Sequence, residues 1–133
     1  MALLMAGYIP EYFRAIAAFV PISDLKKWHE QNPSYAPHID YCTGGEDNEL
    51  ALRSPITYID TAARANLKLF HGKFDSCVPV SQSIEFYTEL TKKYPTSRVF
   101  LDVFDGGHQF VPSLFENWIL SQYKESETKT VTG

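Results

Sequence analysis

Asp75 and His108 are the residues whose types and positions are best suited to chemistry. Asp75 follows the predicted strand 67–70 by a few positions, and His108 follows the predicted strand 99–104 in the same way. A carboxylate that binds one nitrogen of an imidazole fixes its tautomer and stabilises the imidazolium, while the other nitrogen moves protons. The two residues could therefore form the acid–base half of a Ser–His–Asp triad, provided that the fold brings their loops together.

Both residues also have ordinary structural explanations. An aspartate after a strand is often a turn former, and glycines beside a histidine often only make a tight loop. From these residues alone, the structural explanation is the commoner one, and a catalytic role needs support from the rest of the chain.

Other residues near these loops have chemically active side chains, but we expect structural roles for them. Cys77 lies close to Asp75 and could be a nucleophile, yet a half-buried structural thiol is expected. His71 is expected to pack beneath the loop that carries Asp75. Trp28, Tyr35 and Tyr41 could line a substrate pocket, although ordinary packing is the commoner role of aromatic residues.

A metal site is not expected. His38, Asp40 and Cys42 alternate, so an extended chain would place all three on one side, and zinc accepts such ligands. No fourth ligand is evident, and we therefore predict no metal at these residues.

Composition limits the classes of partner. The chain has 133 residues, 44% of them hydrophobic, so one domain with a packed core is expected. The net charge is −4 and the basic residues are scattered, which argues against nucleic acid. The longest apolar run, Ala15–Ile22, is too short to cross a bilayer, so no membrane partner is expected. Two cysteines do not make a disulfide framework; a reducing compartment such as the cytoplasm is the default, and localisation stays open.

The hydrophobic pattern alternates between helices and strands. Strands are expected over 15–20, 67–70 and 99–104; helices are expected over 1–6, ended by Gly7, over a short segment capped by Ser23 or Asp24, over 81–94 with Ile84, Tyr87, Leu90 and Tyr94 facing inward, and over 113–123. Residues 31–53 contain prolines and glycines and are expected to be irregular. This order predicts an α/β fold, a mostly parallel sheet of about three strands flanked by helices, with a disordered tail over 124–133. In such sheets ligands bind outside the carboxyl ends of the strands, and the loops that carry Asp75 and His108 both begin there.

The motif G-x-x-D-x-x-V-P at 72–79, followed by a helix, a strand and G-G-H at 106–108, resembles the catalytic domain of prolyl-oligopeptidase-like serine hydrolases of the α/β-hydrolase superfamily. R-S-P-I-T-Y at 53–58 resembles the segment that enters the acid strand in that family, and M-A-L at 1–3 resembles the helix after its nucleophile elbow. These segments cover the chain up to about residue 123. Residues 1–123 are therefore expected to be the carboxyl-terminal part of an α/β-hydrolase catalytic domain.

The resemblance implies a serine hydrolase, a peptidase or esterase, that works through an acyl-enzyme on a peptide or ester substrate. Asp75 would be the triad acid and His108 the triad base, in the chain order of α/β-hydrolases. No G-x-S-x-G occurs in the sequence; by the family pattern the serine would lie about five positions before Met1. We therefore expect the chain to be inactive alone and to need the missing N-terminal part of the same domain.

An alternative belongs to another class of function. The chain could be a catalytically inactive fragment or a degenerate paralogue that forms a homo-oligomer. In the family's sheet the strand over 15–20 would lie beside the strand that leads to the nucleophile. Without that neighbour it would expose an apolar edge on which another chain could pair.

Overall fold

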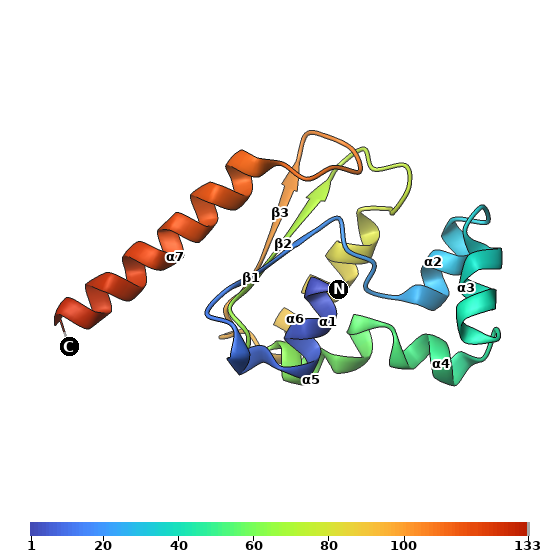
Figure 1. Cartoon of the computed structure of the whole chain (residues 1–133), viewed down its shortest axis with the longest axis horizontal. Helices are drawn as coiled ribbons and strands as arrows, with labels where there is room; N and C mark the ends of the chain where they lie inside the picture. Colours follow the sequence, from blue (N-terminus) through green and yellow to red (C-terminus); the bar gives the residue numbers. More distant parts are fainter. Residues whose placement is uncertain (133) are drawn as a thin grey trace.

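Strand β2 (Leu67–Gly72) is the centre of a sheet of three parallel strands. It pairs with β1 (Ile16–Phe19) on one side and with β3 (Val99–Phe104) on the other, in the order β1-β2-β3. The predicted parallel sheet is confirmed, and all three strands match their expected positions within two residues. Because the strands are parallel, the loops after β2 and β3 emerge at the same edge of the sheet (Figure 1).

The computed structural model describes the backbone of residues 1–132 and the side chains of residues 1–124. No helix in this described part is both long enough and apolar enough to cross a membrane. Two short 3-10 helices, η1 (Pro10–Tyr12) and η2 (Pro55–Tyr58), accompany the α-helices. The α-helices are α1 (Ala2–Tyr8), α2 (Leu25–Gln31), α3 (Ala36–Thr43), α4 (Asp47–Leu52), α5 (Ile59–Ala62), α6 (Ser81–Lys93) and α7 (Pro112–Thr132).

Helices lie on both sides of the strands, with α1, α5 and α6 on one side and α7 on the other (Figure 1). The main core lies on the first side, where Leu67 and Leu69 of β2 pack against Phe86 and Leu90 of α6, all fully buried. On the second side the buried ring of Phe70 meets Trp118 of α7, with ring centroids 6.4 Å apart. Alternate residues of β2 thus point to opposite faces, as a strand covered on both sides requires.

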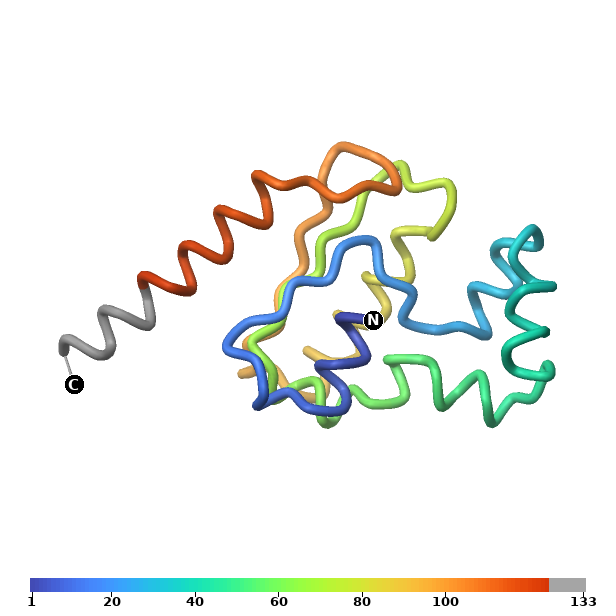
Figure 2. Tube along the Cα trace, in the orientation of Figure 1, coloured from blue at the N-terminus to red at the C-terminus, as the bar shows by residue number. Residues whose placement is uncertain are grey.

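Residues 31–53, predicted to be irregular, form two helices instead. Pro37 stands in the first turn of α3, where a proline lacks no hydrogen bond that the helix needs. Gly44 ends α3 in the left-handed conformation, with φ +66°, and its N–H donates to the Asp40 carbonyl. The residues taken as helix breakers are therefore the start and stop signals of short helices. Figure 2 shows this region at the opposite end of the molecule from α7.

Gly7 was predicted to end the first helix, and that prediction is wrong. Gly7 lies inside α1 and is buried. A Cβ at this position would lie 2.8 Å from the Cβ of Tyr58. The glycine therefore allows α1 to approach η2 closely, which no local pattern in the sequence reveals. The predicted cap of α2 is confirmed, since the Asp24 side chain accepts from the Lys27 N–H at 3.2 Å.

The carboxyl-terminal helix begins close to its predicted start. α7 spans Pro112–Thr132, whereas the pattern predicted a helix over 113–123. The predicted disordered tail covers residues 124–133. The side chains of 125–133 and the backbone of residue 133 lie outside the described part. The division into a domain and a tail therefore stays a prediction.

Candidate active site

The loop after β2 buries the Asp75 carboxylate and holds one of its oxygens with the loop's own backbone. The loop turns tightly, because the Asp75 N–H donates to the Gly72 carbonyl at 3.2 Å. Oδ1 of Asp75 accepts from the N–H groups of Cys77 and Val78, each at 2.9 Å. The Asp75 side chain is fully buried. A buried carboxylate needs such donors, and these two hold Oδ1 in place.

The loop after β3 is bound to the acid loop through the backbone. The Lys73 N–H donates to the Phe104 carbonyl and the Phe74 N–H donates to the Gly106 carbonyl, each at 2.9 Å. Gly72 makes this approach possible, because a Cβ there would overlap the Gly107 carbonyl oxygen and lie 2.6 Å from that of Gly106. The requirement for glycine at position 72 is therefore steric.

His108 and Asp75, 33 positions apart in the chain, meet above the sheet edge. Nδ1 of His108 lies 2.9 Å from Oδ2 of Asp75, and the imidazole remains 45% exposed. Since a carboxylate only accepts, Nδ1 carries the proton and Nε2 has the lone pair. This is the tautomer that a general base beside a nucleophile requires. The structure thus brings together the two residues that the sequence singled out.

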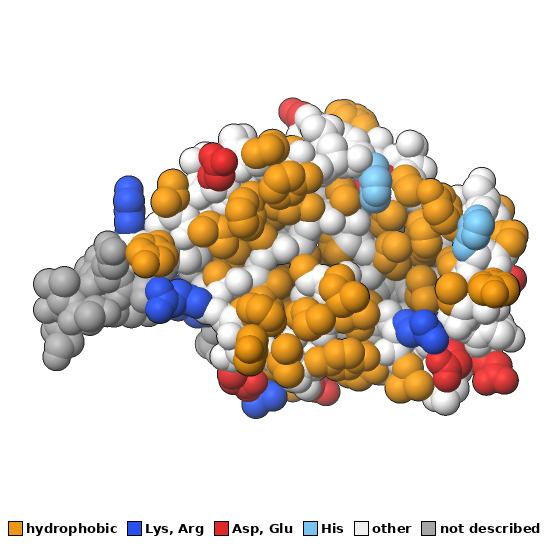
Figure 3. Space-filling view, viewed as in Figure 1, with side chains coloured by type: hydrophobic (Ala, Val, Ile, Leu, Met, Phe, Trp, Pro, Cys, Tyr) orange, Lys and Arg blue, Asp and Glu red, His pale blue; other side chains and the backbone are white. Residues whose placement is uncertain are grey.

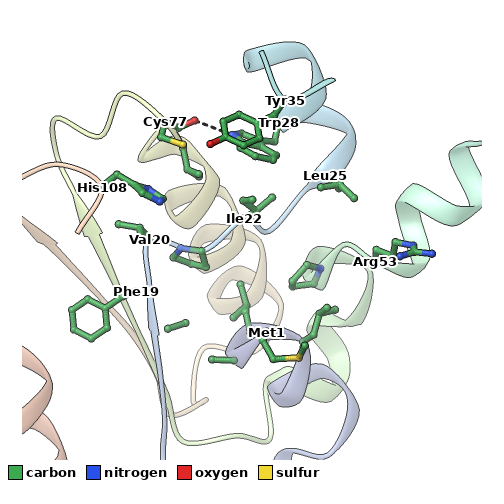
Figure 4. Close-up of a pocket in the computed structure, with 17 residues that line it drawn as sticks. Met1, Phe19, Val20, Ile22, Leu25, Trp28, Tyr35, Arg53, Cys77 and His108 are labelled. Atoms are coloured by element: carbon green, nitrogen blue, oxygen red, sulfur yellow. Dashed lines mark hydrogen bonds between the residues drawn. The ribbon is translucent and has the colours of Figure 1, made fainter. Parts of the chain in front are cut away.

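An open pocket of about 530 Å³ lies beside His108 (Figure 4). The imidazole reaches it from one side and Trp28 and Tyr35 line it at another, so these two aromatic residues lie where a substrate could bind. They also pack together, with ring centroids 5.0 Å apart, so packing and pocket lining are both fulfilled. Tyr41 does not line this pocket and is 92% exposed. On this face of the molecule hydrophobic side chains gather around the hollow, and charged groups lie mostly at the periphery (Figure 3).

Cys77 also lines the pocket, and its backbone is fully engaged. Its N–H donates to Asp75, and its carbonyl accepts from Trp28 Nε1 and from Asn32 Nδ2, both at 2.9 Å. The thiol is half-buried, as expected for a structural cysteine. These contacts connect the acid loop to α2 and so to the wall of the pocket.

The extended arrangement considered for His38, Asp40 and Cys42 is wrong, because these residues lie on helix α3. Asp40 instead accepts from Nε2 of His29, 2.9 Å away. Among the residues whose side chains are described, no group of three His, Cys, Asp or Glu residues could hold a metal ion.

His71 lies beneath the acid loop, as predicted, and is completely buried. Its Nε2 lies 2.8 Å from the Val78 carbonyl and 3.3 Å from Oδ2 of Asp75, and its Nδ1 lies 2.7 Å from Ser83 Oγ on α6. Burial lowers the pKa of His71 from its ordinary value, although the Val78 carbonyl and the Asp75 carboxylate oppose this effect.

Two polar residues of α6 that the sequence analysis did not single out position this region. Ser83 holds His71, and Gln82 Oε1 accepts from the N–H groups of Ser23 and Asp24 at 3.0 and 2.8 Å. Gln82 and Ser83 are both buried. The helical pattern predicted instead that Ile84 would face inward, and this is wrong, because Ile84 is 42% exposed. The hydrophobic pattern cannot reveal a buried polar face, because it counts only apolar residues.

One strained residue was also missed. Val20, which directly follows β1 and lines the pocket, has φ +45°, an unfavourable conformation for a β-branched residue. Its N–H donates to the Phe70 carbonyl at 2.7 Å, which holds the strand end in place.

Comparison with known proteins supports the resemblance stated above. A sequence model of the prolyl oligopeptidase family matches residues 1–124. No curated protein matches the sequence.

Solved structures support the fold. An acylaminoacyl peptidase of Pyrococcus horikoshii is similar with a TM-score of 0.69 and 23% identity, over 80% of this chain and 17% of that chain. A puromycin-hydrolyzing peptidase of Mycobacterium tuberculosis is similar with a TM-score of 0.70 and 24% identity, over 81% of this chain and 17% of that chain. An esterase of Pyrococcus furiosus is similar with a TM-score of 0.63 and 19% identity, over 93% of this chain and 48% of that chain. The chain thus has a partial α/β-hydrolase fold and spans less than half of each of these proteins.

Proposed function

The chain belongs to the prolyl oligopeptidase family, and on that basis we propose that it carries the acid–base half of a serine hydrolase active site. The observation that supports this most strongly is the 2.9 Å contact between Asp75 Oδ2 and His108 Nδ1 at the rim of the pocket. Asp75 is the triad acid and His108 the general base. The serine comes from a segment outside this sequence, because no G-x-S-x-G occurs in it.

The reaction proceeds through an acyl-enzyme. His108 Nε2 takes the serine hydroxyl proton as the oxygen attacks the carbonyl carbon, and then gives this proton to the leaving amine or alcohol. A water then attacks the acyl-enzyme while His108 takes its proton; the ester bond to the serine breaks, the acyl group leaves as a carboxylic acid, and His108 returns the proton to the serine oxygen. Asp75 stabilises the imidazolium formed in both halves. No metal or organic cofactor is needed.

The substrate class is a peptide or a carboxylic ester. Two of the similar solved structures are peptidases by name and one is an esterase. Apart from Arg53 and His108 the pocket is lined mostly by apolar residues, among them Trp28 and Tyr35, and this lining suits an apolar side chain or acyl group of the substrate.

The test uses the full open reading frame that contains this sequence. The purified protein is assayed with peptide and ester substrates and with a fluorophosphonate probe, which labels activated serines. We expect hydrolysis and labelling of a serine upstream of this segment, and no labelling of the segment alone. Full activity after His108→Ala would refute the assignment.

A second candidate function is self-association, and the position of β1 favours it. β1 is apolar and lies at the edge of the sheet, paired only with β2 among the described strands. An apolar edge strand is a template for pairing, and a second copy of the chain could supply the partner. Light scattering of the isolated segment at micromolar concentration should show a dimer or larger species. A stable, folded monomer would exclude this candidate.

A further inference from the structure

The environment of the buried His71 defines its protonation. Nε2 faces two acceptors, the Val78 carbonyl at 2.8 Å and Asp75 Oδ2 at 3.3 Å. Neither of them can donate, so Nε2 carries a proton. Nδ1 then accepts from the hydroxyl of Ser83, 2.7 Å away, if the ring is neutral. A neutral ring with its proton on Nε2 satisfies every one of these contacts.

Other groups around His71 favour the neutral form. The imidazole is fully buried, and burial lowers its pKa because water cannot solvate a charged ring there. The titratable groups that face it are Asp75 and His108, and His108 lowers the pKa of His71 further. Helix α6 contributes the uncharged hydroxyl of Ser83. A charged His71 would also compete with His108 for the Asp75 carboxylate.

The Asp75 carboxylate is therefore shared between two imidazoles. Oδ1 accepts from the two backbone N–H groups of the acid loop, and Oδ2 accepts from His108 Nδ1 and lies 3.3 Å from the Nε2–H of His71, which also donates to the Val78 carbonyl. His108 lies on an exposed loop and is 45% exposed, so it cannot by itself hold the carboxylate still. His71 is anchored on both sides, by the Val78 carbonyl and by Ser83.

From these contacts we propose that His71 is a positioning residue. Its neutral imidazole, fixed in the Nε2–H tautomer by Ser83, holds Asp75 Oδ2 in the direction from which it binds His108. The effect of His71 on turnover rests on the proposed function. Its tautomer and its effect on the Asp75–His108 contact do not, and they can be measured on this chain whether or not an enzyme is formed.

The tautomer is tested first, by nitrogen-15 NMR of the histidine rings. We expect His71 to take up its second proton at a lower pH than an ordinary histidine, and the neutral ring to carry its proton on Nε2. Ser83→Ala removes the hydroxyl that fixes Nδ1 and should give a mixture of tautomers. Ordinary titration of His71, or a proton on Nδ1 in the neutral ring, would overturn the proposal.

The positioning is tested with a matched pair of variants. His71→Phe keeps an aromatic ring but has no donor, whereas His71→Gln has an amide N–H that can reach the position of Nε2. In His71→Phe the downfield proton signal of His108 Nδ1 should be lost through faster exchange with water. In His71→Gln it should persist. Equal spectra of the two variants would overturn the proposal, and if His71→Phe does not fold, the comparison of His71→Gln and Ser83→Ala with the wild type takes its place.

Turnover of the full-length protein gives the final readout. We expect His71→Phe to lower kcat about 10- to 100-fold with little change in KM, since a small displacement of a catalytic group has this order of effect. His71→Gln should restore most of the loss. A protein without hydrolase activity would contradict the proposed function while leaving the NMR results to decide on His71. An active protein in which His71→Phe has the wild-type kcat would contradict the role of His71 alone.

Discussion

The loops after β2 and β3 hold the two halves of one hydrogen-bonded pair in opposite environments. The Asp75 side chain is completely buried, whereas the His108 side chain is 45% exposed beside the pocket. Asp75 has donors on both of its oxygens, and His108 has one described partner for Nδ1. The carboxylate of Asp75, which must keep its direction, is thus buried, and the imidazole of His108, which would exchange protons, faces the pocket.

The anchoring of the two loops differs in the same way. The acid loop is held by polar contacts to α2 and α6, through Cys77 and His71. The histidine loop accepts two backbone hydrogen bonds from the acid loop, at Phe104 and Gly106. Beyond His108 it rests on aromatic contacts, with the Phe110 ring 4.7 Å from that of Phe19 and 5.8 Å from that of Phe115. Directional contacts to two helices hold the acid loop, whereas the less directional packing of rings supports the segment that follows the base.

The largest expected effect comes from His108→Ala in the full-length enzyme. Removal of the base should lower kcat by about 10⁴- to 10⁶-fold. The free energy of unfolding should fall by about 1 kcal/mol or less, because the imidazole is 45% exposed and water can take its place beside Asp75 Oδ2. Steady-state kinetics and urea denaturation measure the two effects. A large loss of stability would show that the two loops do not differ as described.

Asp75→Asn should have the next largest effect, on both quantities. The amide can still accept from the backbone N–H groups of Cys77 and Val78, but its NH₂ group then faces the N–H groups of His108 and His71. We expect kcat to fall by about 10⁴-fold and the free energy of unfolding to fall by about 1–3 kcal/mol, because buried donors lose their acceptor. Steady-state kinetics and urea denaturation again measure the two effects. An unchanged stability would contradict the conclusion that the donors around the Asp75 carboxylate depend on it as their acceptor.

Gly72→Ala tests the contact between the loops. The added methyl group would overlap the Gly107 carbonyl, so the two loops must move apart at a cost of about 1–3 kcal/mol. Gly107→Ala is the matched control, because a Cβ there would have no atom within 4 Å. Thermal unfolding of both variants should show a lower midpoint for Gly72→Ala only. Equal midpoints would mean that the loops can separate without cost.

The smallest effect expected is on the pH dependence of stability. Burial lowers the pKa of His71, so the unfolded chain binds a proton more readily than the folded protein. The contribution to stability is therefore present above the ordinary histidine pKa of about 6.5 and is lost as the pH falls below it. Urea denaturation between about pH 7.5 and 5 should show a steeper loss for the wild type than for His71→Gln. Parallel curves would indicate that His71 takes up its proton in the folded state as readily as in the unfolded state.

Much of this fold could be predicted because the main elements carry local signals. A continuous apolar run marked β1, short and mostly apolar segments marked β2 and β3, and an aspartate marked the start of α2. The prolines and glycines of 31–53 were misjudged, because the same residues can begin and end short helices or interrupt them. Gly7 was misjudged because its neighbour, Tyr58, is distant in sequence.

The candidate site was predictable only in part. Asp75 and His108 stood out because each follows a strand and belongs to a recognisable motif. Gln82 and Ser83 did not, because a polar residue in a helix gives no sign that the helix buries it. Trp28, Tyr35 and Tyr41 were expected to pack, with pocket lining as the alternative. Trp28 and Tyr35 do both, whereas Tyr41 is 92% exposed and outside the pocket, since its direction depends on how α3 is turned.

The sequence by itself determined the alternation of strands and helices, and thereby the edge of the sheet where an acid and a base would emerge. Only the tertiary structure decided that the two side chains meet at 2.9 Å and that His71 and Ser83 lie beneath them. The physical reason is the range of the forces involved. Hydrophobic periodicity acts between near neighbours in the chain, whereas a buried hydrogen-bond network depends on elements that come together only when the core is packed.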